Sequence, residues 1–172
     1  MTVTEPVAID TLPFSAADFA ALQERYAQTP EGGAALVVLA LVAWTQDQLL
    51  GEEFLALAAA PECTSAAPGR TSRVLRARER ALLRSRLGEY GYVPYAYLVG
   101  STPANRYAMP PLPLRVAARS TGSAEADRAS VLVDCSGAEA PRPVIMTRDA
   151  AGLWRARDWS ALLAPVQEPE RF

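Results

Sequence analysis

Seven arginines between residues 70 and 86, with one glutamate among them, form the densest group of charges in the chain. If this segment is a helix, four of them share one face within an arc of about 80°: Arg73, Arg76, Arg80 and Arg84. Guanidinium groups bind carboxylates and phosphates in a bidentate way, so this Arg stripe could dock an acidic protein surface or a nucleic-acid backbone. The alternative is a solvated helix face whose charges pair with acids elsewhere in the chain.

A second group of candidates lies where tyrosines surround a segment rich in turn-forming residues: Tyr95, Tyr97, Asn105 and Tyr107. Asn105 can bond nearby backbone groups where the chain reverses, and it tolerates left-handed dihedral angles. Such a turn could bind a ligand. It could equally be a structural loop, in which the rings pack flat and the hydroxyls bond backbone groups.

The third group follows a predicted strand and contains Asp134, Cys135, Ser136, Glu139 and Arg142. A nucleophilic Cys or Ser needs a base or a cationic neighbour, and the sequence contains neither His nor Lys. Prolines on both sides of Arg142 fix its local backbone. We therefore expect Arg142 to organise a turn, with Glu139, Asp134 or a carbonyl as acceptor, and not to act in catalysis.

The missing residue types exclude several classes of chemistry. Triads that use His, Ser-Lys dyads, Schiff-base lysines, P-loop lysines and His-ligated zinc all need residues that are absent here. No spacing of acidic residues selects a carboxylate metal site or a glycosidase pair. We predict no catalytic or metal-binding residues and no cofactor, and a carboxylate-dependent hydrolase is the weakest alternative.

Composition indicates an ordinary globular protein, with 50% apolar and 21% charged residues in 172 residues. The net charge of −2 gives no overall field that would attract polyanions. Two cysteines, Cys63 and Cys135, are too few for a disulfide framework, and the N-terminus lacks the pattern of a secretory signal. We expect free thiols and a cytoplasmic location. The most apolar stretch, Ala34–Trp44, would span about 16 Å as a helix, too short to cross a membrane.

The first half of the sequence predicts helices. Ser15 is an N-cap for a helix over Ala16–Gln28, with a hydrophobic staple between Phe14 and Phe19. The other predicted helices run from Pro30 to about Leu50 with a left-handed cap at Gly51, over Glu52–Ala59, and from a cap at Thr71 or Ser72 to about Glu89.

The second half predicts short strands over Tyr92–Val99, Leu114–Ala118 and Val131–Cys135, then a hairpin of Pro143–Arg148 with Leu153–Arg157. A helical turn over Asp158–Leu163 and a loosely ordered tail over 165–172 follow. The fold class is therefore α+β, with an N-terminal helical layer packed on a small antiparallel sheet. We predict a single domain over 1–172, with a helical half over about 14–90 and a β half over about 92–163.

Two ordered segments, YAYLVGSTPANRY at Tyr95–Tyr107 and SGAEAPRP at Ser136–Pro143, resemble a bacterial domain family of unknown function. A Gly-x-Trp hairpin and a closing WSALL motif follow them in the same order. The resemblance implies a small bacterial protein with a variable helical N-terminal half, and it brings no activity or cofactor. Glu139 and Ala140 stand where the family pattern has Asp and Ser, which disfavours an essential hydroxyl there.

These observations favour a non-enzymatic bacterial accessory or adaptor protein that acts by protein–protein binding. We expect its partner to be another protein or a second copy of the chain, without membrane insertion. The alternative is a module that binds an anion or a nucleic-acid backbone through the Arg stripe.

Overall fold

The computed structural model describes residues 5–67, 69 and 73–171, without the side chains of residues 122–125. Its helices are α1 (Ala16–Tyr26), α2 (Pro30–Gln46), α3 (Gln48–Ala58) and α4 (Ala77–Leu87), with 3₁₀ turns η1 (Pro61–Cys63), η2 (Val93–Tyr97) and η3 (Ser160–Leu163). Its strands are β1 (Val7–Ile9), β2 (Thr64–Ala66), β3 (Arg73–Leu75), β4 (Leu114–Val116), β5 (Ala118–Glu125), β6 (Arg128–Val133), β7 (Arg142–Arg148) and β8 (Trp154–Asp158). Helices come first and most strands follow, which confirms the α+β class.

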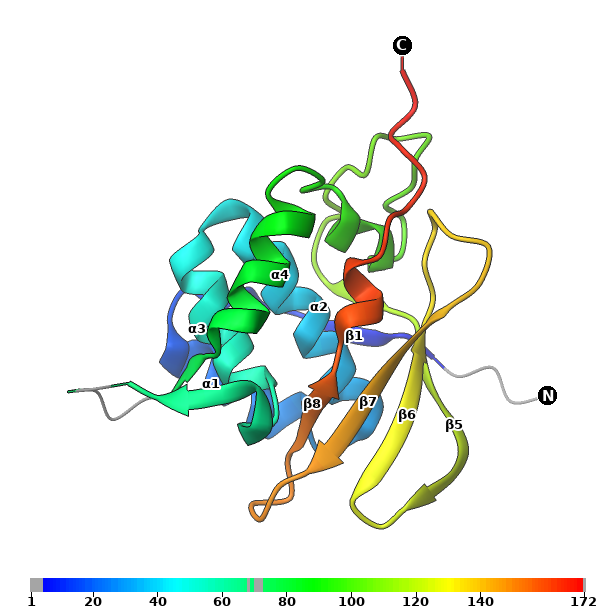
Figure 1. The fold of residues 1–172 in the computed structure, drawn as a ribbon. Coiled ribbons are helices and arrows are strands. Elements are labelled where there is room, and N and C mark those ends of the chain that lie inside the picture. The colour runs from blue at the N-terminus through cyan, green and yellow to red at the C-terminus, as the bar shows by residue number, and fades with distance from the viewer. Residues whose placement is uncertain (1–4, 68, 70–72, 172) are drawn as a thin grey trace.

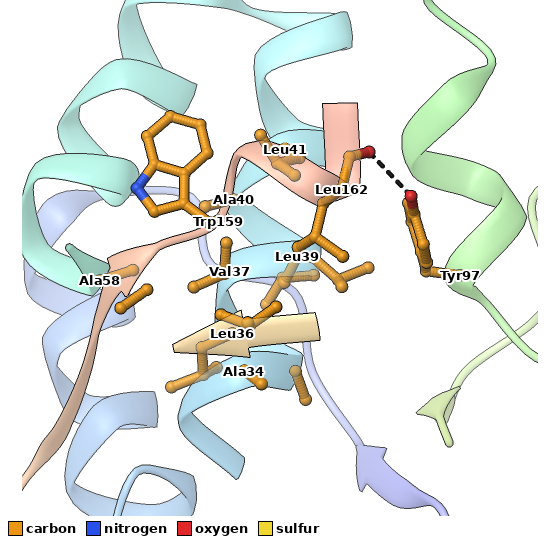
Figure 2. Packing of buried hydrophobic residues seen from close by; sticks show 14 of the residues in the cluster. Ala34, Leu36, Val37, Leu39, Ala40, Leu41, Ala58, Tyr97, Trp159 and Leu162 are labelled. Carbon is orange, nitrogen blue, oxygen red and sulfur yellow. Dashed lines mark hydrogen bonds between the residues drawn. The ribbon is translucent and has the colours of Figure 1, made fainter. Parts of the chain in front are cut away.

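Strands β5, β6, β7 and β8 form an antiparallel sheet in that order, while β1 pairs with β4 and β2 pairs with β3. Helix α2 lies between the sheet and the other helices (Figure 1). It is apolar on all sides and buried from Gly32 to Val42, as expected for a central helix. Figure 2 shows Trp159 and Leu162 packed over this helix near Val37 and Leu41. The buried core therefore joins residues from both halves of the sequence.

The predicted start of α1 is confirmed, because the Ser15 hydroxyl accepts a hydrogen bond from the Asp18 N–H at 3.1 Å. The predicted staple is wrong. Phe14 is 80% exposed, whereas Phe19 is buried and stacks on Phe54 of α3 with ring centroids 4.8 Å apart. Packing between the two helices buries the whole Phe19 ring, which a staple at the helix end would not do.

The predicted boundary between the second and third helices is also wrong. Helix α2 ends at Gln46, and Asp47 caps α3 by accepting a hydrogen bond from the Leu50 N–H at 3.2 Å. Gly51 lies inside α3 and not at a left-handed cap. A Cβ atom at Gly51 would lie 2.2 Å from the Trp44 Cα, so this glycine allows the two helices to approach closely.

The fourth helix begins later than predicted. Thr71 and Ser72, the predicted caps, lie outside the described residues, and Arg73–Leu75 form β3, which pairs with β2. Helix α4 starts at Ala77 after Arg76, and it ends close to the predicted boundary. Pairing of β2 with β3 therefore replaces the first predicted turn of the helix.

The predicted strand over Tyr92–Val99 is wrong, because this segment contains the 3₁₀ turn η2. Pro94 lacks an N–H for a strand ladder, and the Tyr95 N–H bonds the Tyr92 carbonyl at 3.1 Å. The β7–β8 hairpin and the closing helical turn are confirmed. At that hairpin, Gly152 has a φ of 84°, and the Asp149 carboxylate accepts hydrogen bonds from two backbone N–H groups of the turn.

Candidate functional site

Arg142, at the start of β7, ties three segments together. Its guanidinium donates hydrogen bonds to the Tyr97 hydroxyl at 3.1 Å, to the Ala164 carbonyl at 2.6 Å and to the Pro165 carbonyl. The Tyr97 hydroxyl donates in turn to the Leu162 carbonyl at 2.9 Å (Figure 2). Of the three acceptors predicted for Arg142, namely Glu139, Asp134 or a carbonyl, it is carbonyl groups that accept its hydrogen bonds. Asp134 instead pairs with Arg119 at 3.1 Å, and Glu139 is exposed.

Asn105 holds the chain reversal, as predicted. Its side-chain oxygen accepts hydrogen bonds from the N–H groups of Thr102 at 2.9 Å and Ala108 at 3.3 Å, and its amide donates to the Gly100 carbonyl at 2.7 Å. The residues with positive φ are the next two, Arg106 at 59° and Tyr107 at 54°. Asn105 therefore stabilises a left-handed segment that begins one residue later.

Tyr107 connects this turn to the C-terminal segment. Its ring stacks on Tyr92 with centroids 5.5 Å apart, and its hydroxyl donates to the Gln167 carbonyl at 2.6 Å. The Gln167 N–H bonds the Gly137 carbonyl at 2.8 Å. A Cβ atom at Gly137 would lie 2.3 Å from the Tyr107 hydroxyl oxygen, so the contact requires glycine there.

The segment after Pro165 does not fit the expectation of a loose tail. Besides the bonds of Gln167, the Glu170 N–H bonds the Pro103 carbonyl at 3.0 Å, and Val166 is buried. In Figure 1 this segment runs beside the loop that follows η2 and beside the connection between β6 and β7. The carbonyl groups of Pro103 and Gly137 and the hydroxyl of Tyr107 bond this C-terminal segment at the corner where these loops meet, and the local composition of the tail does not reveal such partners.

The candidate partner-binding tyrosines form their hydrogen bonds within the chain. Tyr97 and Tyr107 are buried, and burial raises the pKa of both hydroxyls, that of Tyr107 to about 12. Tyr95 is half-buried, and its hydroxyl bonds Thr45 Oγ1 at 3.1 Å and Gln46 Nε2 at 3.3 Å in α2. These contacts support the structural interpretation of the Tyr-lined turn, because the hydroxyls are already engaged within the chain.

Residues of both sequence signatures line a groove of about 540 Å³. One wall contains Val99, Gly100 and Ser101, and the other contains Ala138, Glu139 and Ala140. We call this cavity the signature groove. Its walls lie 35 or more residues apart in the sequence, so their proximity follows from the fold and not from local spacing.

The lining of the signature groove includes backbone donors and several polar side chains. In the part of the chain that the structure describes, the N–H groups of Ala138, Glu139 and Ala140 have no hydrogen-bond acceptor. The Ser101 hydroxyl is buried and has no partner among the described residues, while the Ser136 hydroxyl donates to the Ser101 carbonyl at 2.7 Å. Burial raises the pKa of the Cys135 thiol, which keeps it protonated at neutral pH.

The predicted Arg stripe does not form. Arg73 lies in β3 and donates to Thr64 Oγ1 at 2.8 Å, and Arg76, the residue before α4, donates to the Thr64 carbonyl at 3.2 Å. Arg84 pairs loosely with Glu52 at 3.9 Å. Arg80 is half-buried and its Nε has no partner among the described residues. With two of four guanidinium groups bonded to the β2–β3 hairpin, the set presents no single helical face.

Neither a metal-binding cluster nor a membrane-spanning helix occurs in the described ranges. Residues 5–67, 69 and 73–171 contain no cluster of three or more His, Cys, Asp or Glu side chains that could hold a metal ion. No helix among them has the length and apolar character needed to cross a membrane.

Comparison with known proteins identifies a family for this chain. Residues 11–170 match the model of a family described as a domain of unknown function, DUF6935. No curated protein and no solved structure matches the chain.

Proposed function

The chain belongs to the DUF6935 family, whose description assigns no activity, and from the geometry of the signature groove we propose that it is a non-enzymatic adaptor. The groove binds an extended segment of a partner protein. The observation that carries this proposal is the pair of signature segments lining one open cavity. Fold membership alone gives no function, so the argument rests on the groups that face the groove.

Unused backbone donors support an extended ligand. Three successive N–H groups, from Ala138 to Ala140, lack acceptors in the described chain. An extended peptide offers carbonyl groups at regular intervals and can satisfy donors of this kind. Main-chain bonds of this kind supply affinity without requiring large side chains on the receptor.

The side chains of the groove support a partner that is neutral or basic. Val99 is 46% exposed, and small residues at Gly100, Ala138 and Ala140 leave room for a ligand backbone. Glu139 is exposed in the lining, and no arginine lines this groove among the described residues. The other lining carboxylate, Asp134, is already paired with Arg119, so an acidic segment would meet the uncompensated charge of Glu139.

Selection from a library of random linear peptides tests this function. We expect enriched peptides to be neutral or basic and to bind the wild-type chain with a measurable Kd. Val99→Glu and Ala140→Trp should each weaken that binding by about tenfold or more, which corresponds to about 1.4 kcal/mol. Leu49→Glu is the matched control, because Leu49 is 76% exposed and lies outside the groove.

Two results would contradict the proposal. One is a library that yields no peptide above background. The other is a set of peptides whose affinities are the same for Val99→Glu, Ala140→Trp and Leu49→Glu, which would place their site elsewhere on the molecule.

A further inference from the structure

A second cavity, of about 440 Å³, shares no lining residue with the signature groove. Three arginines from three elements line it: Arg78 in α4, Arg128 in β6 and Arg157 in β8. All three are exposed, and none of their guanidinium groups forms a hydrogen bond or ion pair within the described chain. None of the three belongs to the predicted Arg stripe. We call this cavity the Arg pocket.

Strand register explains how the sheet delivers two of the arginines. Residues alternate between faces of a strand, and β6 buries Ala129 and Val131, which leaves Arg128 on the outer face. In β8 the pairing shifts, so Met146 opposes Ala156 but Ile145 opposes Asp158. Arg157 is the extra residue of this bulge. Bulges redirect a side chain and are frequent beside binding sites.

The Arg pocket also contains an acceptor in need of a donor. Glu79 Oε2 is buried and has no hydrogen-bond partner within the described residues. The other carboxylate in the lining, Asp158, already accepts bonds from the N–H and the hydroxyl of Ser160. The other oxygen of Glu79, Oε1, is not enclosed and has no partner within the described residues either, so a ligand in the cavity can donate a hydrogen bond to it.

The charges of the lining define the ligand. Three guanidinium groups and two carboxylates leave a formal charge of +1. Cys63 adds none, because burial raises the pKa of its thiol, which donates to the Arg157 carbonyl at 3.3 Å. A phosphate monoester carries a charge of about −1.5 to −2 at pH 7, and an attached ammonium group reduces this to about −1 or slightly less.

We propose that the Arg pocket binds a small phosphate monoester that also carries an amino group. The phosphate lies among Arg78, Arg128 and Arg157, whose planar guanidinium groups match its oxygens. The amino group donates to Glu79. The volume lies within the range of small-molecule sites and excludes a polynucleotide as the ligand enclosed there.

Calorimetric titration with three probes tests the site: phosphoethanolamine, ethyl phosphate and inorganic phosphate, each compared with NaCl at equal ionic strength. We expect phosphoethanolamine to bind one site per chain, at least fivefold more tightly than ethyl phosphate. Arg128→Gln and Arg157→Gln should each weaken its binding at least tenfold without changing the melting temperature of the unliganded chain. Arg86→Gln, an exposed position of α4 outside the pocket, is the matched control.

The role of Glu79 has its own variant. Glu79→Gln should abolish the preference for phosphoethanolamine over ethyl phosphate while ethyl phosphate still binds. The proposal is overturned if phosphoethanolamine gives no saturable heat beyond that of NaCl. It is also overturned if the Arg128 and Arg157 variants bind like Arg86→Gln, or if ethyl phosphate binds the wild-type chain as tightly as phosphoethanolamine.

Discussion

The side chain of Arg142 links β7 to η2 and to the C-terminal segment. Its guanidinium bonds one hydroxyl and two backbone carbonyls that belong to η2 and to the C-terminal segment. The flanking prolines predict a structural role for this arginine, and its three hydrogen bonds support that interpretation. The prolines could not indicate its acceptors, because the Ala164 and Pro165 carbonyls lie 22 and 23 residues further along the chain and only the fold brings them to Arg142.

Arg142→Ala should lower the free energy of unfolding by about 1–3 kcal/mol, since it leaves the Tyr97 hydroxyl and the Ala164 carbonyl without their charged donor. Arg119→Ala, which removes only an exposed ion pair with Asp134, should cost about 0–1 kcal/mol. Urea denaturation of both variants measures the difference. Equal losses would remove the structural role of Arg142.

Tyr107 makes stability depend on alkaline pH. Burial, with smaller contributions from Cys135 and Tyr92, raises its pKa from 10.0 to about 12. The folded chain therefore keeps a proton that the unfolded chain releases, so this contribution is complete below about pH 10 and is lost as the pH rises to about 12. Two pKa units correspond to about 3 kcal/mol at most.

Urea denaturation at about pH 9 and about pH 11 measures that loss. Tyr107→Phe should be less sensitive to the change in pH than the wild-type chain, because Phe has no proton to release. The pKa of Tyr97 is also raised by burial, so some pH dependence should remain in the variant. An unchanged difference between the two pH values would contradict the assignment to Tyr107.

At the level of elements, the sequence predicts those that carry their own local signals. The caps at Ser15 and Thr29 and the turn before Gly152 depend on neighbouring residues, and the structure has them as predicted. Elements decided by distant contacts were misassigned. Pairing with β2 makes a strand of Arg73–Leu75, and packing turns the aromatic segment of η2 into a 3₁₀ turn.

The difference between Phe14 and Phe19 tests how α1 is held. Phe19→Ala should destabilise the fold by about 3–5 kcal/mol, because it removes a buried ring that stacks on Phe54. Phe14→Ala should change stability by less than about 0.5 kcal/mol, since its ring is exposed. Thermal melts of both variants provide the check. A large loss of stability for Phe14→Ala would support the hydrophobic staple between Phe14 and Phe19.

The arginines around α4 should separate in the same way. Arg73→Gln removes two bonds to Thr64 and should cost about 1–3 kcal/mol. Arg84→Gln removes an exposed contact at 3.9 Å and should cost less than about 1 kcal/mol. Chemical denaturation of the single variants decides this. Equal stability of both variants would mean that the bonds of Arg73 to Thr64 contribute no more than an exposed ion pair.

At the scale of the whole molecule, the signature groove and the Arg pocket could not be predicted from the sequence. Each cavity joins residues that are distant along the chain, such as Val99 with Ala140 and Arg78 with Arg157. The sequence shows the turn formers and small residues of the two signatures. The proximity of the two segments, however, depends on the bonds of Arg142 and Tyr107 to the C-terminal segment.

Amide NMR of the labelled chain, titrated with a peptide selected against it, tests the central claim most directly. We predict that the largest shift changes lie in residues 98–102 and 138–140. The N–H signals of Ala138, Glu139 and Ala140 should move in the direction expected for newly formed hydrogen bonds. Changes centred on any other surface, with these two segments unmoved, would contradict the assignment of the signature groove as the binding site.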